Sequence, residues 1–194
     1  MISCFKGKFK VTSPRGSRIV GGKSEYHGGL DLVAIDDKTV YAIADGKVDA
    51  VPYEANGFGY YVRQLLPDGR RIYYGHMAKG SIKVKAGQSI KKGDKLGVMG
   101  STGKSTGAHT HIELRIKGTS KTSLDIAEFC GIPNKVGTYV YKPTMTAEEK
   151  HTYAVECACN LEDKTGLEKQ TINWLWTYKY ADDLFIKLWE AMDN

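Results

Sequence analysis

The 194-residue chain has few cysteines and no long apolar segment. No stretch approaches the ~20 apolar residues of a membrane-spanning helix, and the N-terminus lacks the ~7–15-residue apolar core of a secretory signal. Four irregularly spaced cysteines are too few for a disulfide framework, which predicts reduced thiols: Cys4, Cys130, Cys157 and Cys159. We therefore expect a chain made in the cytoplasm, with no signal peptide and no membrane span.

The chain also lacks a continuous basic run, although it is basic overall. Its 28 Lys and Arg residues against 22 Asp and Glu give a formal charge of +6 and a pI near 9.0. Such a charge attracts polyanions, but the lysines are dispersed and no nucleic-acid-binding module is recognisable. We expect a solvated basic surface and no nucleic-acid partner.

Residues 8 to about 118 consist of short β-type segments separated by glycine turns. Asp68-Gly69, between two such segments, is typical of a hairpin because glycine tolerates a positive φ. Residues 107–115, GAHTHIELR, alternate between apolar and polar side chains, as a half-buried strand does. The sequence predicts a mainly β domain over residues 1–120.

After about residue 145 the sequence pattern changes from β-type to helical. Thr146 and Glu149 have the spacing of a capping box. Further along, apolar and aromatic residues recur at roughly helical intervals: Trp174, Leu175, Trp176, Tyr178, Leu184, Leu188, Trp189 and Met192. We expect a small α-helical module over residues 146–194, joined by a linker over residues 121–145. Its apolar side chains should be buried within the module, against the β domain or against a partner.

Four of the five histidines lie beside glycines in the β region: His27, His76, His109 and His111. His109 and His111 are two residues apart in a predicted strand, so their side chains should point to the same face. A catalytic zinc site uses three imidazole or carboxylate ligands and a water molecule. Two of these histidines with Asp31 would complete such a site, and the other two could transfer protons near neutral pH. A merely polar strand face is the alternative for the H-x-H pair.

The motifs HGGLD, YYGHM and GAHTHIELR, in this order, resemble the lysostaphin-type (LytM-like) zinc metallopeptidases that cut peptidoglycan peptides. The resemblance extends over residues 9 to 118 and implies an antiparallel β-sheet catalytic domain. It implies that His27, Asp31 and His111 bind Zn²⁺. It also implies that His76 and His109 are the catalytic pair.

Two neighbouring features allow more than one interpretation. Glu113 shares the face of His111 and could accept a hydrogen bond from that imidazole or pair with a surface lysine. The segment GVMGSTGKSTG contains Gly-Lys-Ser, but a phosphate loop would need a glycine where Val98 stands. We expect this segment to border the substrate groove, as the resemblance implies.

These observations together predict a zinc-dependent endopeptidase that hydrolyses peptide bonds in bacterial peptidoglycan. A phage or prophage lysin would reach the cell wall after release from the cell or as part of a phage particle. The C-terminal helices would then contact the wall or a particle partner. The alternative is a non-catalytic, zinc-holding protein that binds the cell wall or activates another hydrolase.

Overall fold

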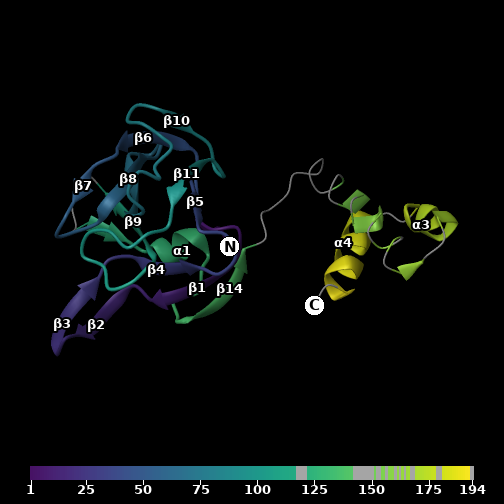
Figure 1. The fold of residues 1–194 in the computed structure, drawn as a ribbon, viewed down its shortest axis with the longest axis horizontal. Coiled ribbons are helices and arrows are strands. Elements are labelled where there is room, and N and C mark those ends of the chain that lie inside the picture. The colour runs from purple at the N-terminus through teal and green to yellow at the C-terminus, as the bar shows by residue number, and fades with distance from the viewer. Residues whose placement is uncertain are drawn as a thin grey trace. The chain divides into compact units, whose positions relative to one another are not determined.

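The computed structural model describes residues 1–116, 122–141, 151, 154–155, 157–159, 161, 163, 165–166, 169–177 and 181–192. The chain forms two compact units, Met1–Pro143 and Thr144–Asn194 (Figure 1). Among the described residues, no helix is both long enough and apolar enough to cross a bilayer.

The first unit is built on one large antiparallel sheet. Its strands are β1 (Gly7–Ser13), β4 (Leu30–Ala34), β6 (Gly46–Ala50), β7 (Tyr53–Glu54), β8 (Gly59–Leu65), β9 (Arg70–Met77), β10 (Ser89–Ile90), β12 (Thr110–Ile116), β13 (Ser123–Leu124) and β14 (Gly137–Tyr141). The main path runs β10, β6, β8, β9, β12, β4, β1, β14, with β7 on β8 and β13 on β12. Two smaller sheets pair β2 (Gly16–Val20) with β3 (Lys23–His27) and β5 (Thr39–Tyr41) with β11 (Lys95–Val98).

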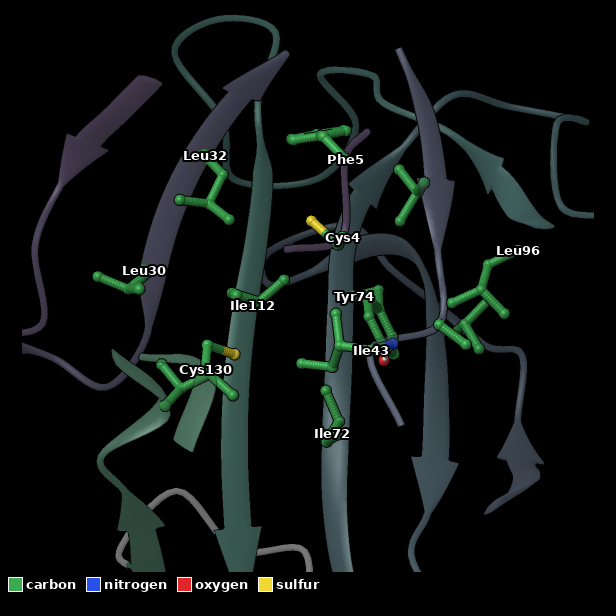
Figure 2. Packing of buried hydrophobic residues seen from close by; sticks show 14 of the residues in the cluster. Cys4, Phe5, Leu30, Leu32, Ile43, Ile72, Tyr74, Leu96, Ile112 and Cys130 are labelled. Carbon is green, nitrogen blue, oxygen red and sulfur yellow. Dashed lines mark hydrogen bonds between the residues drawn. The ribbon is translucent and has the colours of Figure 1, made fainter. Parts of the chain in front are cut away.

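The core lies on one face of this sheet because successive strand residues point to opposite sides. On β4, Leu30 and Leu32 are fully buried, and on β12 Ile112 is fully buried beside them in the register of the two strands. Figure 2 shows these side chains with Cys4 and Tyr74 in the same apolar layer. The prediction of a mainly β fold with a small helical C-terminal part is confirmed.

The segment predicted as a linker, residues 121–145, is structured over most of its length. Residues 122–141 form β13, the helix α1 (Ile126–Cys130) and β14, and all of them belong to the first compact unit, Met1–Pro143. Asp125 caps α1 by accepting hydrogen bonds from the amides of the first helical turn, and the whole of β14 pairs with β1, from Gly7 to Val11. Each of these elements is at most five residues long, which is too short to give a periodic sequence signal.

The second unit contains α3 (Lys169–Leu175) and α4 (Ala181–Met192). Phe185 on α4 is fully buried in a small apolar cluster, and the ring of Trp176 lies 4.3 Å from it, centroid to centroid. Trp189 also packs against this cluster. The predicted capping box at residues 146 and 149, Tyr178 and the side chain of Trp174 lie outside the described residues.

Candidate functional site

Three of the predicted site residues meet where β3, β4 and β12 adjoin. His27 is the last residue of β3, and Asp31 on β4 stands directly opposite His111 in the register with β12. Asp31 Oδ1 lies 2.9 Å from His111 Nδ1 and 3.2 Å from His27 Nε2. The two imidazole nitrogens are 3.0 Å apart. Three ligand-type atoms therefore converge on one point.

The hydrogen bonds on the far side of each ring identify the nitrogens that face this point. His27 Nδ1 lies 2.8 Å from the carbonyl oxygen of Pro14, which can only accept, so Nδ1 carries the hydrogen. His111 Nε2 lies 3.2 Å from a carboxylate oxygen of Glu113 and donates in the same way. His27 Nε2, His111 Nδ1 and Asp31 Oδ1 then turn lone pairs toward one another. A cation between them would remove this repulsion, and two imidazole nitrogens with one carboxylate oxygen suit a divalent metal ion such as zinc.

The pKa shifts at this cluster show that it favours positive charge. Burial alone would raise the pKa of Asp31, but hydrogen bonds and charges from His111 and His27 hold it well below its usual range. Burial would likewise lower the pKa of His111, yet Asp31 and Glu113 raise it. Without a metal ion, a proton on His111 would balance the carboxylates, which is the role a bound cation would take over.

For Glu113 the sequence left two interpretations open, a hydrogen bond to His111 or a pair with a surface lysine, and the structure favours the first. Glu113 is only 3 % exposed, and among the residues that the structure describes it pairs with arginine and not with a lysine. Besides the bond to His111, its carboxylate accepts from Arg115 Nε at 2.8 Å and Nη2 at 2.9 Å. The guanidinium carbon of Arg115 lies 4.5 Å from the ring centre of Tyr73 and 5.1 Å from that of Phe58. Glu113 therefore orients a candidate metal ligand and is itself fixed by an arginine that lies against two aromatic rings.

The two glycines of HGGLD make room for this arrangement. A Cβ on Gly28 would stand 2.6 Å from Glu113 Oε1. A Cβ on Gly29 would stand 2.7 Å from His111 Nε2 and 2.2 Å from the carbonyl oxygen of Ile112. Only glycine fits at these positions without moving the imidazole or its carboxylate partner.

The predicted catalytic pair, His76 and His109, lies beside the metal-ligand cluster. Their ring centres are 4.5 Å apart, and His109 Nε2 lies 3.6 Å from Asp31 Oδ1. His76 Nδ1 donates to the carbonyl of Thr102 and His109 Nδ1 to that of Gly107, both at 2.8 Å. Each ring thus keeps Nε2 free of hydrogen and able to accept a proton.

His76 has the backbone geometry of a strained functional residue. Among the described residues, it alone of the non-glycines has a positive φ, 59°. Its amide donates to the carbonyl of Phe58 at 2.6 Å, at the end of β9. Burial lowers the pKa of His76 to about 4, so the imidazole is neutral and available as a base at neutral pH.

All five predicted residues line one open groove of about 680 Å³. Lys104 also lines the groove, in the segment expected to border it, whereas other lining residues were not predicted from the sequence, among them Arg18, Tyr26 and Phe58. Arg18 Nη1 lies 3.4 Å from Asp31 Oδ2 and Arg18 Nη2 lies 2.6 Å from Glu25. The contact between Arg18 and Asp31 has no signal in the local sequence, because it joins β2 to β4 across 13 residues. Arg115 could have been inferred, since it shares the strand face of Glu113.

The fifth histidine and the cysteines of the second unit lie outside the groove. His151 is in the second unit, exposed, with Nδ1 3.0 Å from Asp182. Cys157 is buried in a helical segment of that unit and Cys159 is exposed. Neither cysteine lines the groove.

Comparison with known proteins places the chain in a family. The model of peptidase family M23 matches residues 25–123. An uncharacterized metalloprotease of Haemophilus influenzae is 38% identical over 114 residues, covering 59% of this chain and 24% of that protein. The peptidoglycan DD-endopeptidase ShyB of Vibrio cholerae is 32% identical over 126 residues, covering 60% and 28%. The chain thus matches about a quarter of the length of these relatives.

Solved structures give the same result over most of the first unit. The catalytic domain of lysostaphin, an antimicrobial peptidase from Staphylococcus simulans, superposes with a TM-score of 0.58 at 28% identity, covering 63% of this chain and 92% of that one. A variant catalytic domain of the prophage-encoded M23 protein EnpA from Enterococcus faecalis gives 0.55 at 34% identity, covering 64% and 93%. The resemblance inferred from the motifs is confirmed, and the chain belongs to peptidase family M23.

Proposed function

We propose that this chain is a zinc-dependent endopeptidase that hydrolyses peptide bonds in bacterial peptidoglycan. The observation that carries the proposal is the convergence of three lone pairs, from His27, Asp31 and His111, beside two imidazoles with free Nε2 atoms. The peptidoglycan DD-endopeptidases among its relatives support the substrate class.

Each residue has a role that its geometry supports. His27, Asp31 and His111 would hold the zinc ion, which supplies Lewis acidity that polarises the scissile carbonyl and acidifies water. His76 and His109 present unprotonated Nε2 atoms to the groove. Either ring can accept a proton from the attacking water and, once protonated, either can stabilise the oxyanion or donate to the leaving amine.

A non-catalytic protein that binds the wall or activates another hydrolase is the second candidate. Such a protein would need neither the strained backbone of His76 nor a second imidazole beside it. Both features are present, which favours catalysis over simple binding.

The decisive experiment separates these two candidates. Purified protein with zinc should solubilise isolated cell walls, lose this activity with a chelator and regain it when zinc is restored. His27→Ala, Asp31→Ala and His111→Ala should each fail to retain zinc, measured by atomic emission, because a three-ligand site becomes incomplete. His151→Ala removes a histidine outside the site and should behave like the wild type. Zinc retention without release of muropeptides would support the activator instead.

We further propose a phage or prophage lysin as the biological setting. The support is the likeness to the catalytic domain of a prophage-encoded protein. In this setting the second unit would hold the enzyme at the cell wall or on a phage particle. Sedimentation of the chain with purified cell walls, with and without residues 144–194, tests that role.

A further inference from the structure

One loop orients both proton-transfer histidines. Residues 101–107 connect the β11 side of the groove to β12, and two carbonyls of this loop accept the Nδ1 hydrogens of His76 and His109. His109 is bonded within its own turn, to Gly107. His76 lies on β9, so its hydrogen bond to the carbonyl of Thr102 depends on the contacts that hold the loop against β9.

The side chain of Thr102 makes these contacts. Its hydroxyl donates to the carbonyl of Met77 at 2.7 Å and accepts from the amide of Tyr60 at 3.0 Å. Met77 is the neighbour of His76 on β9, and Tyr60 lies on β8. A single hydroxyl thus bonds the loop to two strands while the carbonyl of the same residue holds the imidazole.

Two glycines allow the loop to approach the sheet this closely. A Cβ on Gly59 would stand 2.3 Å from the hydroxyl oxygen of Thr102, and a Cβ on Gly103 would stand 2.2 Å from the amide nitrogen of Gly59. Both glycines have positive φ, 65° and 72°. The amide of Lys104 then donates to the carbonyl of Gly57 at 2.9 Å, so the contact continues along the loop.

We infer that Thr102 is a positioning residue for His76. Its hydroxyl fixes the place of its own carbonyl, which selects the Nδ1–H tautomer of His76 and keeps Nε2 open to a proton. The inference rests on the proposed function, in which His76 transfers protons. Because the hydrogen bonds of Thr102 run to Tyr60, Met77 and His76, its removal should leave metal binding intact.

Two substitutions separate the hydroxyl from the shape of the side chain. Thr102→Val keeps the shape and loses the hydroxyl, whereas Thr102→Ser keeps the hydroxyl. Loss of an orienting partner typically costs about 10–100-fold, so kcat should fall by that factor in Thr102→Val with KM and zinc content unchanged. Thr102→Ser should restore most of the rate. Thr39→Val, which removes a hydroxyl bonded to the exposed Asp37 just before β5, is the matched control and should retain wild-type kcat.

A spectroscopic readout tests the tautomer directly. Two-bond ¹H–¹⁵N imidazole spectra of the zinc-loaded protein should show the Nδ1–H form of His76 in the wild type and in Thr102→Ser, and a mixture of tautomers in Thr102→Val. An unchanged kcat or tautomer in Thr102→Val would overturn the inference, as would an equal loss in Thr102→Ser. If the wild type hydrolyses no peptide, the proposed function fails, and the tautomer spectra still decide the role of Thr102.

Discussion

Replacing Glu113 by Gln should destabilise the metal-free protein as well as weaken metal binding. The Glu113 side chain is 4 % exposed and that of Arg115 13 % exposed, and the pair is doubly hydrogen-bonded. Glutamine resembles the protonated carboxyl in shape, so the substitution isolates the loss of charge. The guanidinium would keep its contacts with Tyr73 and Phe58 but lose the carboxylate that balances it.

Two routes give the size of this effect. Removing one partner of a buried ion pair costs about 3–5 kcal/mol, and the remaining solvent contact of Arg115 favours the lower end. Burial would raise the pKa of Glu113, but His111 and Arg115 lower it from 4.5 to about 2. At about 1.4 kcal/mol per pH unit, this difference also corresponds to about 3 kcal/mol. We therefore expect a loss of about 3 kcal/mol in the free energy of unfolding at pH 7.

The pH dependence has a definite sign. Because the pKa of Glu113 is lower in the folded protein than in the unfolded chain, its contribution is complete well above pH 4.5 and is lost as the pH falls toward 2. The glutamine variant has no such group. The difference in stability between wild type and variant should therefore fall to less than half of its neutral value by about pH 3.

Urea dependence of amide exchange on β12 measures the stability of the first unit alone. The three tryptophans, Trp174, Trp176 and Trp189, all belong to the second unit, so their fluorescence serves as an internal control that should not change. Asp68→Asn is the matched variant, since it breaks a similar arginine pair, with Arg70, at the surface. Such exposed pairs contribute at most about 1 kcal/mol. Equal effects of the two substitutions, or a Glu113→Gln effect that persists undiminished to pH 2, would refute the reasoning.

Three further predictions concern other parts of the chain. His76→Ala and His109→Ala should retain zinc but lose about 10²–10⁴-fold in hydrolysis rate, and near-normal turnover in either would remove that residue from catalysis. Thr110→Val should raise the free energy of unfolding by about 1 kcal/mol in urea titrations, because the buried Thr110 hydroxyl has no hydrogen-bond partner among the described residues. A chain ending at Pro143 should remain folded by circular dichroism and cleave small soluble peptides, since each unit has its own apolar cluster. Loss of zinc binding in that chain would show that the units depend on each other.

The sequence predicted the features that are encoded by a short repeating pattern or by closely spaced motifs. The alternation along β12 identified which residues share the face of His111, and the structure places His109 and Glu113 there. The ordered motifs identified the family. The contact of Arg18 with Asp31 and the contacts of Thr102 could not be predicted, because each joins segments separated by 13 to 42 residues through a side chain with no motif of its own.

The strand β12 carries residues of both the core and the candidate site, so one sequence pattern predicts both. On β12, Thr110, Ile112 and Leu114 are buried on the core face, while His111 and Glu113, together with His109 just before the strand, face the groove. Ile112 stands opposite Leu30 and Thr110 opposite Leu32, and these pairs flank the His111–Asp31 pair. A slip of one residue would turn the apolar side chains toward the groove and move His111 away from Asp31. The apolar packing of β4 against β12 therefore fixes the register that brings the candidate metal ligands within reach of one another, so the geometry of the site is specified by residues that never contact a substrate.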